Sequence, residues 1–184
     1  MDPRVARTRA SLQEALLELA REHPLDAITV ADIAERAGVN RSSFYQHYTD
    51  KETLLADALE MIIDDVSTRI GSVSPADIAA PDELTQYLQH IAENANLYRR
   101  VLGDHGSALI SARLRDRVDG IVRAAMARAM PEPFAGLPVD VIAAAITGSA
   151  LGVITAWLDR DELAPVEVAA GWLWQVLFGK PDAC

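Results

Sequence analysis

Residues 29–51 read TVADIAERAGVNRSSFYQHYTDK and predict a helix, a tight turn and a second helix. Thr29 is a favourable N-cap, and apolar residues follow it at helical spacing as far as Ala37. Gly38 reaches positive φ without steric cost and can end this helix, and Asn40 can cap the next one. Because the turn is short, we expect the two helices to cross steeply, as in helix-turn-helix proteins.

The second of these helices separates two kinds of side chain. At about 100° per residue, Phe44 and Tyr48 fall on one arc, and polar side chains fall on the opposite arc. No acidic residue occurs from Asn40 to Thr49. Hydroxyl, amide, imidazole and guanidinium groups suit phosphates and base edges, which favours DNA contact. The alternative is a plain solvated face, since helix-turn-helix geometry also occurs in proteins that bind no DNA.

From about Thr8 to Leu55 the chain resembles the DNA-binding domain of the TetR family of transcriptional regulators. The matching stretches are RTRASLQEALLELAREH and TVADIAERAGVNRSSFYQHYTDKETLL. The resemblance implies that Lys51, in the first turn of the next helix, grips a phosphate together with nearby backbone amides. The residues expected to contact DNA are Thr29, Arg41, Ser42, Ser43, Tyr45, Gln46, His47 and Lys51.

A preceding helix is expected to support this pair. Leu12, Leu16 and Leu19 form an apolar stripe at helical spacing, which should pack on Ile33 and Phe44. We therefore expect a three-helix DNA-binding domain over residues 1–50, followed over residues 51–184 by a domain for effector binding and dimerisation.

Net charge argues against broad electrostatic attraction to nucleic acid. The chain has 17 basic and 27 acidic residues, a net charge of −10. Binding must then depend on local placement of cations such as Arg4, Arg7 and Arg9. The single Cys184 cannot form an internal disulfide, and the first residues lack the apolar run of a secretion signal. A cytoplasmic protein is expected.

The rest of the chain predicts further helices. No alternating β pattern occurs, so the fold should be all-α, with about nine helices in total. A shift to Ser, Pro, Asp and Ala over residues 72–81 indicates a linker or a short turn. The expected helices after residue 50 cover about 50–71, 82–102, 108–130, 141–158 and 166–178.

Residues 141–158 form an uncharged run of eighteen residues, the lower limit for crossing a bilayer. The run contains Gly148-x-x-x-Gly152, a close-packing pattern of membrane helix pairs. Asp140 and Asp159 flank it, and no cluster of Lys or Arg marks an inner side. A buried helix that another helix approaches closely is the preferred interpretation, and no membrane partner is expected.

Residues 166–178 are nearly as apolar as that run. Two neighbouring helices that are apolar almost all round need a further partner, which predicts an interface. The body of the chain also resembles the C-terminal regulatory domain of TetR-type proteins. This resemblance implies a four-helix bundle across a two-fold axis, hence a homodimer and an inverted-repeat operator. The expected interface residues are Ile146, Gly148, Gly152, Trp157, Trp172 and Trp174.

The resemblance further implies a cavity for a small-molecule effector, unidentified by the sequence. Inward-facing candidates mix apolar and polar groups, although each is more often an ordinary core or surface residue. Linkage then predicts repression that an effector relieves, because an effector that favours misplaced reading helices weakens operator binding. The candidate effector-binding residues are Met61, Tyr87, His90, Ile91, Asn94 and Thr147.

Two other classes of function are alternatives to a DNA-binding regulator. An enzyme finds weak support: Asp104, His105 and Ser107 are neighbours in sequence, whereas a catalytic triad is defined by geometry. His90 and Glu93 lack the second such pair that a di-metal bundle needs. No catalytic residue, metal or cofactor is predicted. The remaining alternative is a helical dimer that binds a small molecule without binding DNA.

Overall fold

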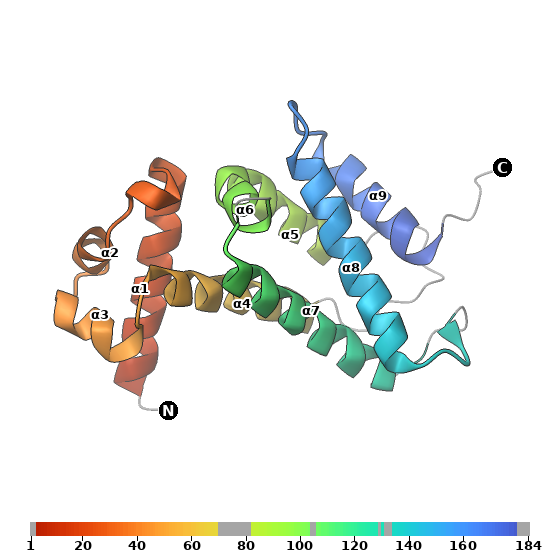
Figure 1. Cartoon of the computed structure of the whole chain (residues 1–184), viewed down its shortest axis with the longest axis horizontal. Coiled ribbons are helices and arrows are strands. Elements are labelled where there is room, and N and C mark those ends of the chain that lie inside the picture. The colour runs from red at the N-terminus through yellow and green to blue at the C-terminus, as the bar shows by residue number, and fades with distance from the viewer. Residues whose placement is uncertain (1–2, 70–81, 104–105, 129, 131–133, 180–184) are drawn as a thin grey trace. The chain divides into compact units, whose positions relative to one another are not determined.

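The computed structural model describes residues 3–69, 82–103, 106–128, 130 and 134–179. Within these ranges the chain forms nine α-helices, one short 3₁₀ helix and no strand, which confirms the expected all-α fold (Figure 1). The expected linker over residues 72–81, the Asp104–His105 pair and Cys184 lie outside the described residues. The elements are α1 (Pro3–Glu22), η1 (Leu25–Ala27), α2 (Val30–Arg36), α3 (Arg41–His47), α4 (Lys51–Arg69), α5 (Asp82–Glu93), α6 (Ala95–Leu102), α7 (Ala108–Arg128), α8 (Val139–Leu158) and α9 (Val166–Phe178).

The chain divides into two compact units. The first runs as far as Ile62 and also includes Asn96–Arg113, and the second comprises Ile63–Ala95 and the chain from Leu114 onward. Helices α4 and α7 each begin in the first unit and continue into the second. The first unit extends beyond the expected domain of residues 1–50, because α1 and the start of α7 both hydrogen-bond to the start of α4.

An apolar core holds α1, α2 and α3 together in the first unit. Leu16, Ile33 and Phe44 are fully buried, and α1 contacts both α2 and α3. Burying each such side chain stabilises the fold by about 1.5–3 kcal/mol. The expected support of the two crossing helices by α1 is confirmed.

Both caps and the turn expected between α2 and α3 are present. Thr29 and Asp32 form a capping box, in which the Thr29 side chain accepts from the Asp32 backbone N–H. Gly38 has φ of 67°, a conformation that costs L side chains energy, and Asn40 caps α3. The backbone N–H of Val39 donates to the carbonyl of Ala34 at 2.9 Å, which closes the end of α2.

The helix expected over residues 82–102 is two helices, because the chain breaks at Asn94 between α5 and α6. Asn94 is 4% exposed, and its side-chain Nδ2 donates to the carbonyl oxygen of His90 at 2.7 Å. This local hydrogen bond competes with the regular helical ladder, which is why Asn favours helix ends. The sequence expectation of one continuous helix was wrong at this point.

In the second unit α9 packs on α5 and α8, and α8 and α9 lie side by side (Figure 1). Leu88, Ile91, Ile142 and Leu173 are buried here. Trp157 is also buried, at 1% exposed, and its Nε1 donates to the carbonyl of Ala164 at 3.0 Å. The expected place of Trp157 in a dimer interface was therefore wrong, because the ring fills the core of its own protomer.

Candidate functional site

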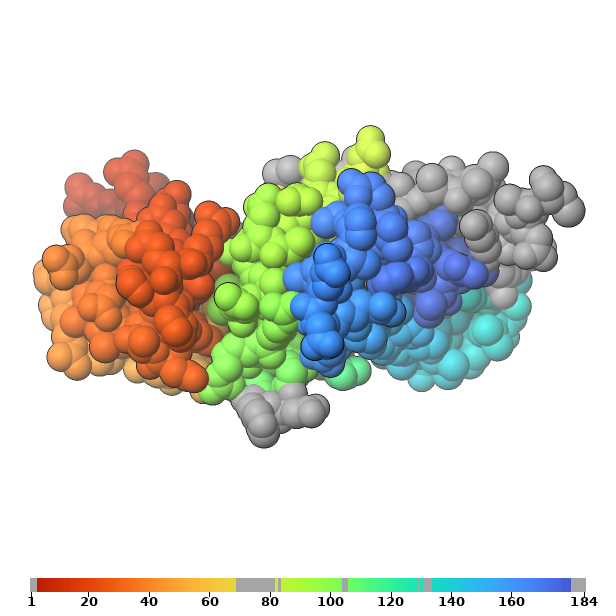
Figure 2. Space-filling view, turned by 90° about the horizontal axis from the view of Figure 1, so that it is seen from above, coloured from red at the N-terminus to blue at the C-terminus, as the bar shows by residue number. Residues whose placement is uncertain are grey.

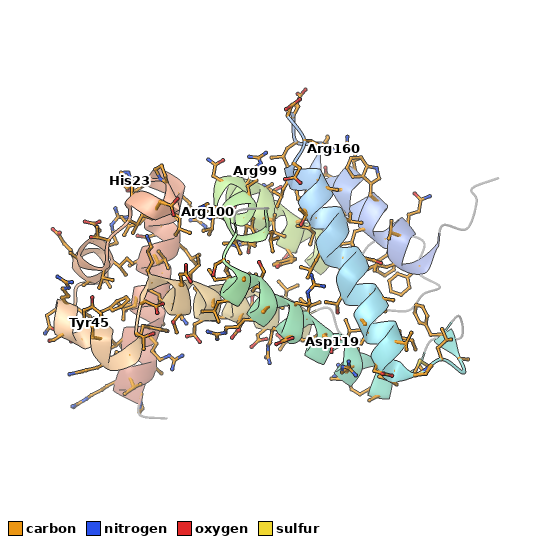
Figure 3. The ribbon with its side chains drawn as sticks, in the orientation of Figure 1. His23, Tyr45, Arg99, Arg100, Asp119 and Arg160 are labelled. Carbon is orange, nitrogen blue, oxygen red and sulfur yellow. The ribbon has the colours of Figure 1, made fainter. Side chains whose placement is uncertain are left out.

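Helix α3 presents a polar face above a buried apolar one. Phe44 is fully buried and Tyr48, the next residue after α3, is 3% exposed. The side chains on the outer arc are exposed or half-exposed, and Tyr45 is 50% exposed (Figure 3). The outer arc comprises Arg41, Ser42, Ser43, Tyr45, Gln46 and His47. Six of the eight residues expected to contact DNA are thus gathered on one accessible surface, the α3 polar face.

Arg41 and Tyr45 support one another on this face. Arg41 Nη2 donates to the Tyr45 hydroxyl at 3.3 Å, and the guanidinium carbon lies 5.7 Å from the ring centroid. The Tyr45 ring meets Phe44 edge to face, with centroids 5.4 Å apart. A cation over an aromatic ring is favourable even at an exposed site. The pair therefore presents a guanidinium and a phenol group at the surface, and the Tyr45 ring rests on the buried Phe44 ring.

Asn40 organises the start of the α3 polar face, a role that the sequence analysis missed. Its Oδ1 accepts from the Ser42 hydroxyl at 2.6 Å, the Ser43 hydroxyl at 3.0 Å and the Ser43 backbone N–H at 2.7 Å. One amide oxygen thus collects both hydroxyls and caps the helix. The signal in the sequence was an Asn N-cap followed by two serines, a combination that favours local side-chain hydrogen bonds.

The other two residues expected to contact DNA have protein partners. The Thr29 hydroxyl donates to Asp32 Oδ2 at 2.8 Å within the capping box. Lys51 Nζ donates to the carbonyl oxygens of Leu25 at 2.5 Å and Ile28 at 2.7 Å. Burial lowers the pKa of the Lys51 ammonium below its usual value. Because two of its three N–H groups are used, Lys51 clamps η1 to the start of α4, which differs from the expected grip on a phosphate.

Several cations elsewhere in the first unit are paired with acids. Arg36 bonds Glu22 at 2.9 Å and Glu18 at 3.3 Å, so it points back to α1. Arg9, one of the cations on which DNA binding was expected to depend, instead bonds Asp57 at 2.6 Å. Arg4 and Arg7 are exposed on α1. Fewer cations than the sequence indicated are therefore available to contact DNA beside the α3 polar face.

Asp57 of α4 is the centre of a polar cluster that the sequence analysis also missed. Its Oδ2 accepts from Arg9 Nη2 at 2.6 Å, Tyr48 Oη at 2.7 Å and Gln13 Nε2 at 2.8 Å. Burial alone would raise the pKa of Asp57, but the hydrogen bonds from Tyr48 and Arg9 outweigh it and lower the pKa. Burial raises the pKa of Tyr48, so this hydroxyl keeps its proton and donates.

The candidate effector residues separate into two groups. Met61 is 46% exposed, so its expected inward orientation was wrong: the buried side of α4 carries Leu59 and Ile63, on the opposite side of the helix. The remaining five lie in the second unit: four on α5 and α8, two helices that both pack on α9, and Asn94 directly after α5. They are Tyr87, His90, Ile91, Asn94 and Thr147.

Thr147 is the most informative member of that group. It is 1% exposed, and its hydroxyl has no hydrogen-bond partner among the residues that the structure describes. Buried hydroxyls are normally satisfied, so an orphaned one is consistent with a group that a ligand completes. Ligand contact by all five residues stays a prediction.

The candidate interface residues on α8 and α9 differ in exposure. An added Cβ at Gly148 or Gly152 would meet no atom within 4 Å, so both glycines border open space. Trp172 is half-buried beneath Arg160, whose guanidinium carbon lies 4.6 Å from a ring centroid. Ile146 is also half-buried.

The expectation that Trp174 lies in the dimer interface was also wrong. It is 7% exposed and lies 4.5 Å from Phe178 between ring centroids, so it belongs to the core of its own protomer. The buried side of α9 that packs on α5 and α8 carries this ring. Across the described parts of the chain, no three His, Cys, Asp or Glu residues group in a way that could hold a metal ion.

Comparison with known families gives two matches that together cover most of the chain. Residues 12–58 match the model described as bacterial regulatory proteins, tetR family. Residues 80–177 match a model described as a transcriptional regulator C-terminal region. The first match covers the α3 polar face and its supports, and the second covers the candidate effector residues of α5 and α8.

Two curated relatives are similar in sequence. An uncharacterised HTH-type transcriptional regulator, YxbF of Bacillus subtilis, is 41% identical over 61 residues, which are 33% of this chain and 16% of that protein. The nucleoid occlusion factor SlmA of Photobacterium profundum is 26% identical over 163 residues, 82% of this chain and 83% of that protein. The chain thus spans about a sixth of the first relative and most of the second.

Solved structures share the fold. A TetR transcriptional regulator from Rhodococcus sp. RHA1 has a TM-score of 0.67 at 19% identity, with 94% of both chains covered. The regulator FadR of Bacillus subtilis, in complex with stearoyl-CoA, has a TM-score of 0.59 at 18% identity, covering 92% of this chain and 98% of that one.

Replacing Lys51 tests its clamping role. Lys51→Met keeps the aliphatic stem but removes the donor from the carbonyls of Leu25 and Ile28. We expect the free energy of unfolding, measured by urea denaturation, to fall by about 1–3 kcal/mol. The slope of log Kd for DNA against log salt concentration should stay unchanged. A decrease of about one in that slope would show instead that Lys51 contacts a phosphate.

Proposed function

The chain belongs to the TetR family of bacterial regulatory proteins, and we propose that it is a repressor that binds an inverted-repeat operator as a homodimer and is released by a small molecule. The α3 polar face carries this proposal. It is free of acidic side chains and accessible, and the buried Phe44 fixes it to the first unit. A net charge of −10 gives the rest of the chain little attraction for DNA, so binding depends on this surface.

The residues of the α3 polar face divide by chemistry. Gln46 and His47 have the donors and acceptors that read base edges in the major groove. Arg41 and Tyr45, at the rim, contact phosphates, which position the helix without reading sequence. The serine hydroxyls are held by Asn40, so they meet the DNA in a fixed orientation.

An apolar stripe on α8 supports homodimerisation. It runs at intervals of three and four residues, and its members are exposed or half-exposed small or aliphatic residues. Neighbouring α9 exposes Val168 and Val176, and the two helices, coloured from cyan to dark blue, adjoin in Figure 2. A second copy of the chain covers both helices across a two-fold axis. The stripe comprises Val141, Ala145, Gly148, Gly152 and Ala156.

A membrane span is an alternative interpretation of helix α8. It is the one helix in the described ranges that is long and apolar enough to cross a bilayer, judged by length and composition. Asp140 and Asp159 flank it, and the proposed dimer covers its exposed face. We therefore assign the stripe to dimerisation and the protein to the cytoplasm.

The effector proposal is supported by the second unit. Thr147 supplies a buried hydroxyl without a partner among described residues, and the surrounding core is apolar. The effector proposed for this region is therefore a small and mostly apolar molecule with one polar group that pairs with the Thr147 hydroxyl. The solved structure of Bacillus subtilis FadR contains stearoyl-CoA, which makes acyl-CoA a comparison ligand for testing this chain. The role of the site is binding, and no enzymatic step is assigned to it.

Gln46→Ala tests base reading by the α3 polar face. Gln46 is exposed, so the fold should be unaffected, while loss of a base contact costs about 1–3 kcal/mol of operator affinity. Selection from random duplexes should give an inverted repeat for the wild type and relaxed preference at one position per half-site for the variant. Gln89→Ala, an exposed glutamine of α5 in the second unit, is the matched control and should bind as the wild type does. Selection of no inverted repeat by the wild type contradicts the proposal.

Gly152→Glu tests the dimer. It places bulk and charge in the α8 stripe, where glycine leaves open space. Light scattering coupled to size exclusion should show a dimer for the wild type and a monomer for the variant. Gly120→Glu, at an exposed glycine of α7 that also borders open space, is the control and should remain dimeric. A wild-type monomer, or a dimeric Gly152→Glu variant, contradicts this interface.

Effector release is tested by linkage. A compound that weakens operator binding by a given factor must bind the operator complex more weakly by the same factor. Calorimetry with apolar compounds, and with a long-chain acyl-CoA for comparison, measures this reciprocity. Thr147→Val should weaken binding of the compound and leave operator affinity without compound unchanged. A compound that binds the second unit and leaves operator affinity unaltered contradicts release.

A further inference from the structure

The carboxylate of Asp57 joins the reading helix to parts of the first unit outside the helix-turn-helix. Tyr48 directly follows α3, and its hydroxyl donates to Asp57 Oδ2 at 2.7 Å. Its ring lies beneath the Arg9 guanidinium, 5.3 Å from the centroid, and 6.0 Å from the ring of Phe44. The Tyr48 hydroxyl also accepts from Gln13 Nε2 of α1 at 3.2 Å. The end of α3 is therefore fixed by hydrogen bonds to α4 and α1 and by two ring contacts.

The other oxygen of Asp57 faces α7. Arg113 Nη2 lies 3.8 Å from Asp57 Oδ1, and the same guanidinium bonds both carboxylate oxygens of Glu60 at 2.7 Å. Asp57 and Glu60 are three residues apart, so they share one face of α4. Arg113 is thus held against α4 by two carboxylates one helical turn apart.

Asp57 thus contacts Tyr48, at the end of α3, through one carboxylate oxygen and Arg113 of α7 through the other. The side chains of Asp57 and Arg113 are 20% and 31% exposed, so their ionic interaction is only partly screened by solvent. Hydrogen bonds lower the pKa of Asp57, and burial raises the pKa of Tyr48. Neither group changes its charge near neutral pH, so the cluster responds to position rather than to protonation.

We propose that Asp57 and Arg113 are positioning residues for operator binding, which couple the start of α7 to the end of α3 through Tyr48. The proposal rests on the proposed DNA-binding function and assigns to it residues outside the reading surface. Helix α7 continues from Arg113 into the second unit as one helix, so a shift of α7 moves the guanidinium relative to Asp57. Asp57 then redistributes its remaining hydrogen bonds, and Tyr48 moves the end of α3.

The test compares arginines on one helix. Arg113→Met keeps the aliphatic stem and removes the guanidinium, and we expect it to weaken affinity for the selected operator about tenfold, as for loss of a contact of about 1.4 kcal/mol. Arg123→Met is the matched control, because Arg123 pairs with Asp119 of its own helix. Its affinity should stay within about twofold of the wild type. Fluorescence anisotropy on one duplex measures both, with thermal unfolding recorded alongside.

A mutant cycle separates positioning from general stability. In an Asp57→Asn background, Arg113→Met should have no further effect on affinity, and Tyr48→Phe combined with Arg113→Met should cost less than the product of the single effects. Arg113→Lys should restore part of the affinity, because it returns the charge. If Asp57→Asn fails to fold, the cycle between Tyr48 and Arg113 carries the test.

Two results overturn the proposal. One is an Arg113→Met variant that binds the operator as the wild type does, and the other is effects of Tyr48→Phe and Arg113→Met that multiply independently. Either leaves the proposed DNA-binding function intact, because the wild type still binds. Failure of the wild type to bind any duplex removes the proposed function and this coupling together.

Discussion

Burial of Phe44 is the interaction on which the reading surface depends. Helix α3 has seven residues, and a helix of that length is unstable alone in water. It exists because Phe44 is fully buried in the core that α1, α2 and α3 share. Once that ring is fixed, the helical repeat determines which side chains face outward. The polar face is therefore a consequence of where the apolar arc is held.

Two polar clusters fix the angles between helices, which apolar packing alone does not determine. Lys51 binds the carbonyls of Leu25 in η1 and of Ile28 directly after it, and Asp57 accepts hydrogen bonds from α1 and from Tyr48. Apolar contacts are non-directional, whereas hydrogen bonds to charged groups fix both distance and angle. Each cluster joins elements far apart in sequence, so each sets the angle of one helix on another. This is the reason that we assign positioning roles to residues that do not reach the reading surface.

In the second unit, by contrast, an apolar surface of α8 is left uncovered within the chain. Helix α8 buries Ile142, Ile154 and Trp157, yet small residues on its far side border open space. A helix that is apolar on both sides is stable in water only when both sides are covered. The same property explains why this helix resembles a membrane span in composition and why a second copy of the chain is its proposed partner.

Local sequence was enough to predict the helices α2 and α3 and the turn between them. Thr29, Gly38 and Asn40 act on their own backbone neighbours, and the apolar repeat is local, so these features were predictable and are confirmed. The apolar character of α8 and α9 was likewise visible in the sequence. The polar face of α3 followed from the helical repeat alone.

Which charged and aromatic groups contact one another depends on the fold of the whole chain. Arg9 and Asp57 are 48 residues apart in sequence, and no local pattern pairs them. Sequence periodicity also left open which side of an apolar helix is buried within the protomer, which is why Trp157 was assigned to an interface. The helical periodicity of a sequence shows only on which side of a helix its apolar side chains lie. The partner at that angle is set by packing between distant segments, because contact depends on the path of the whole chain.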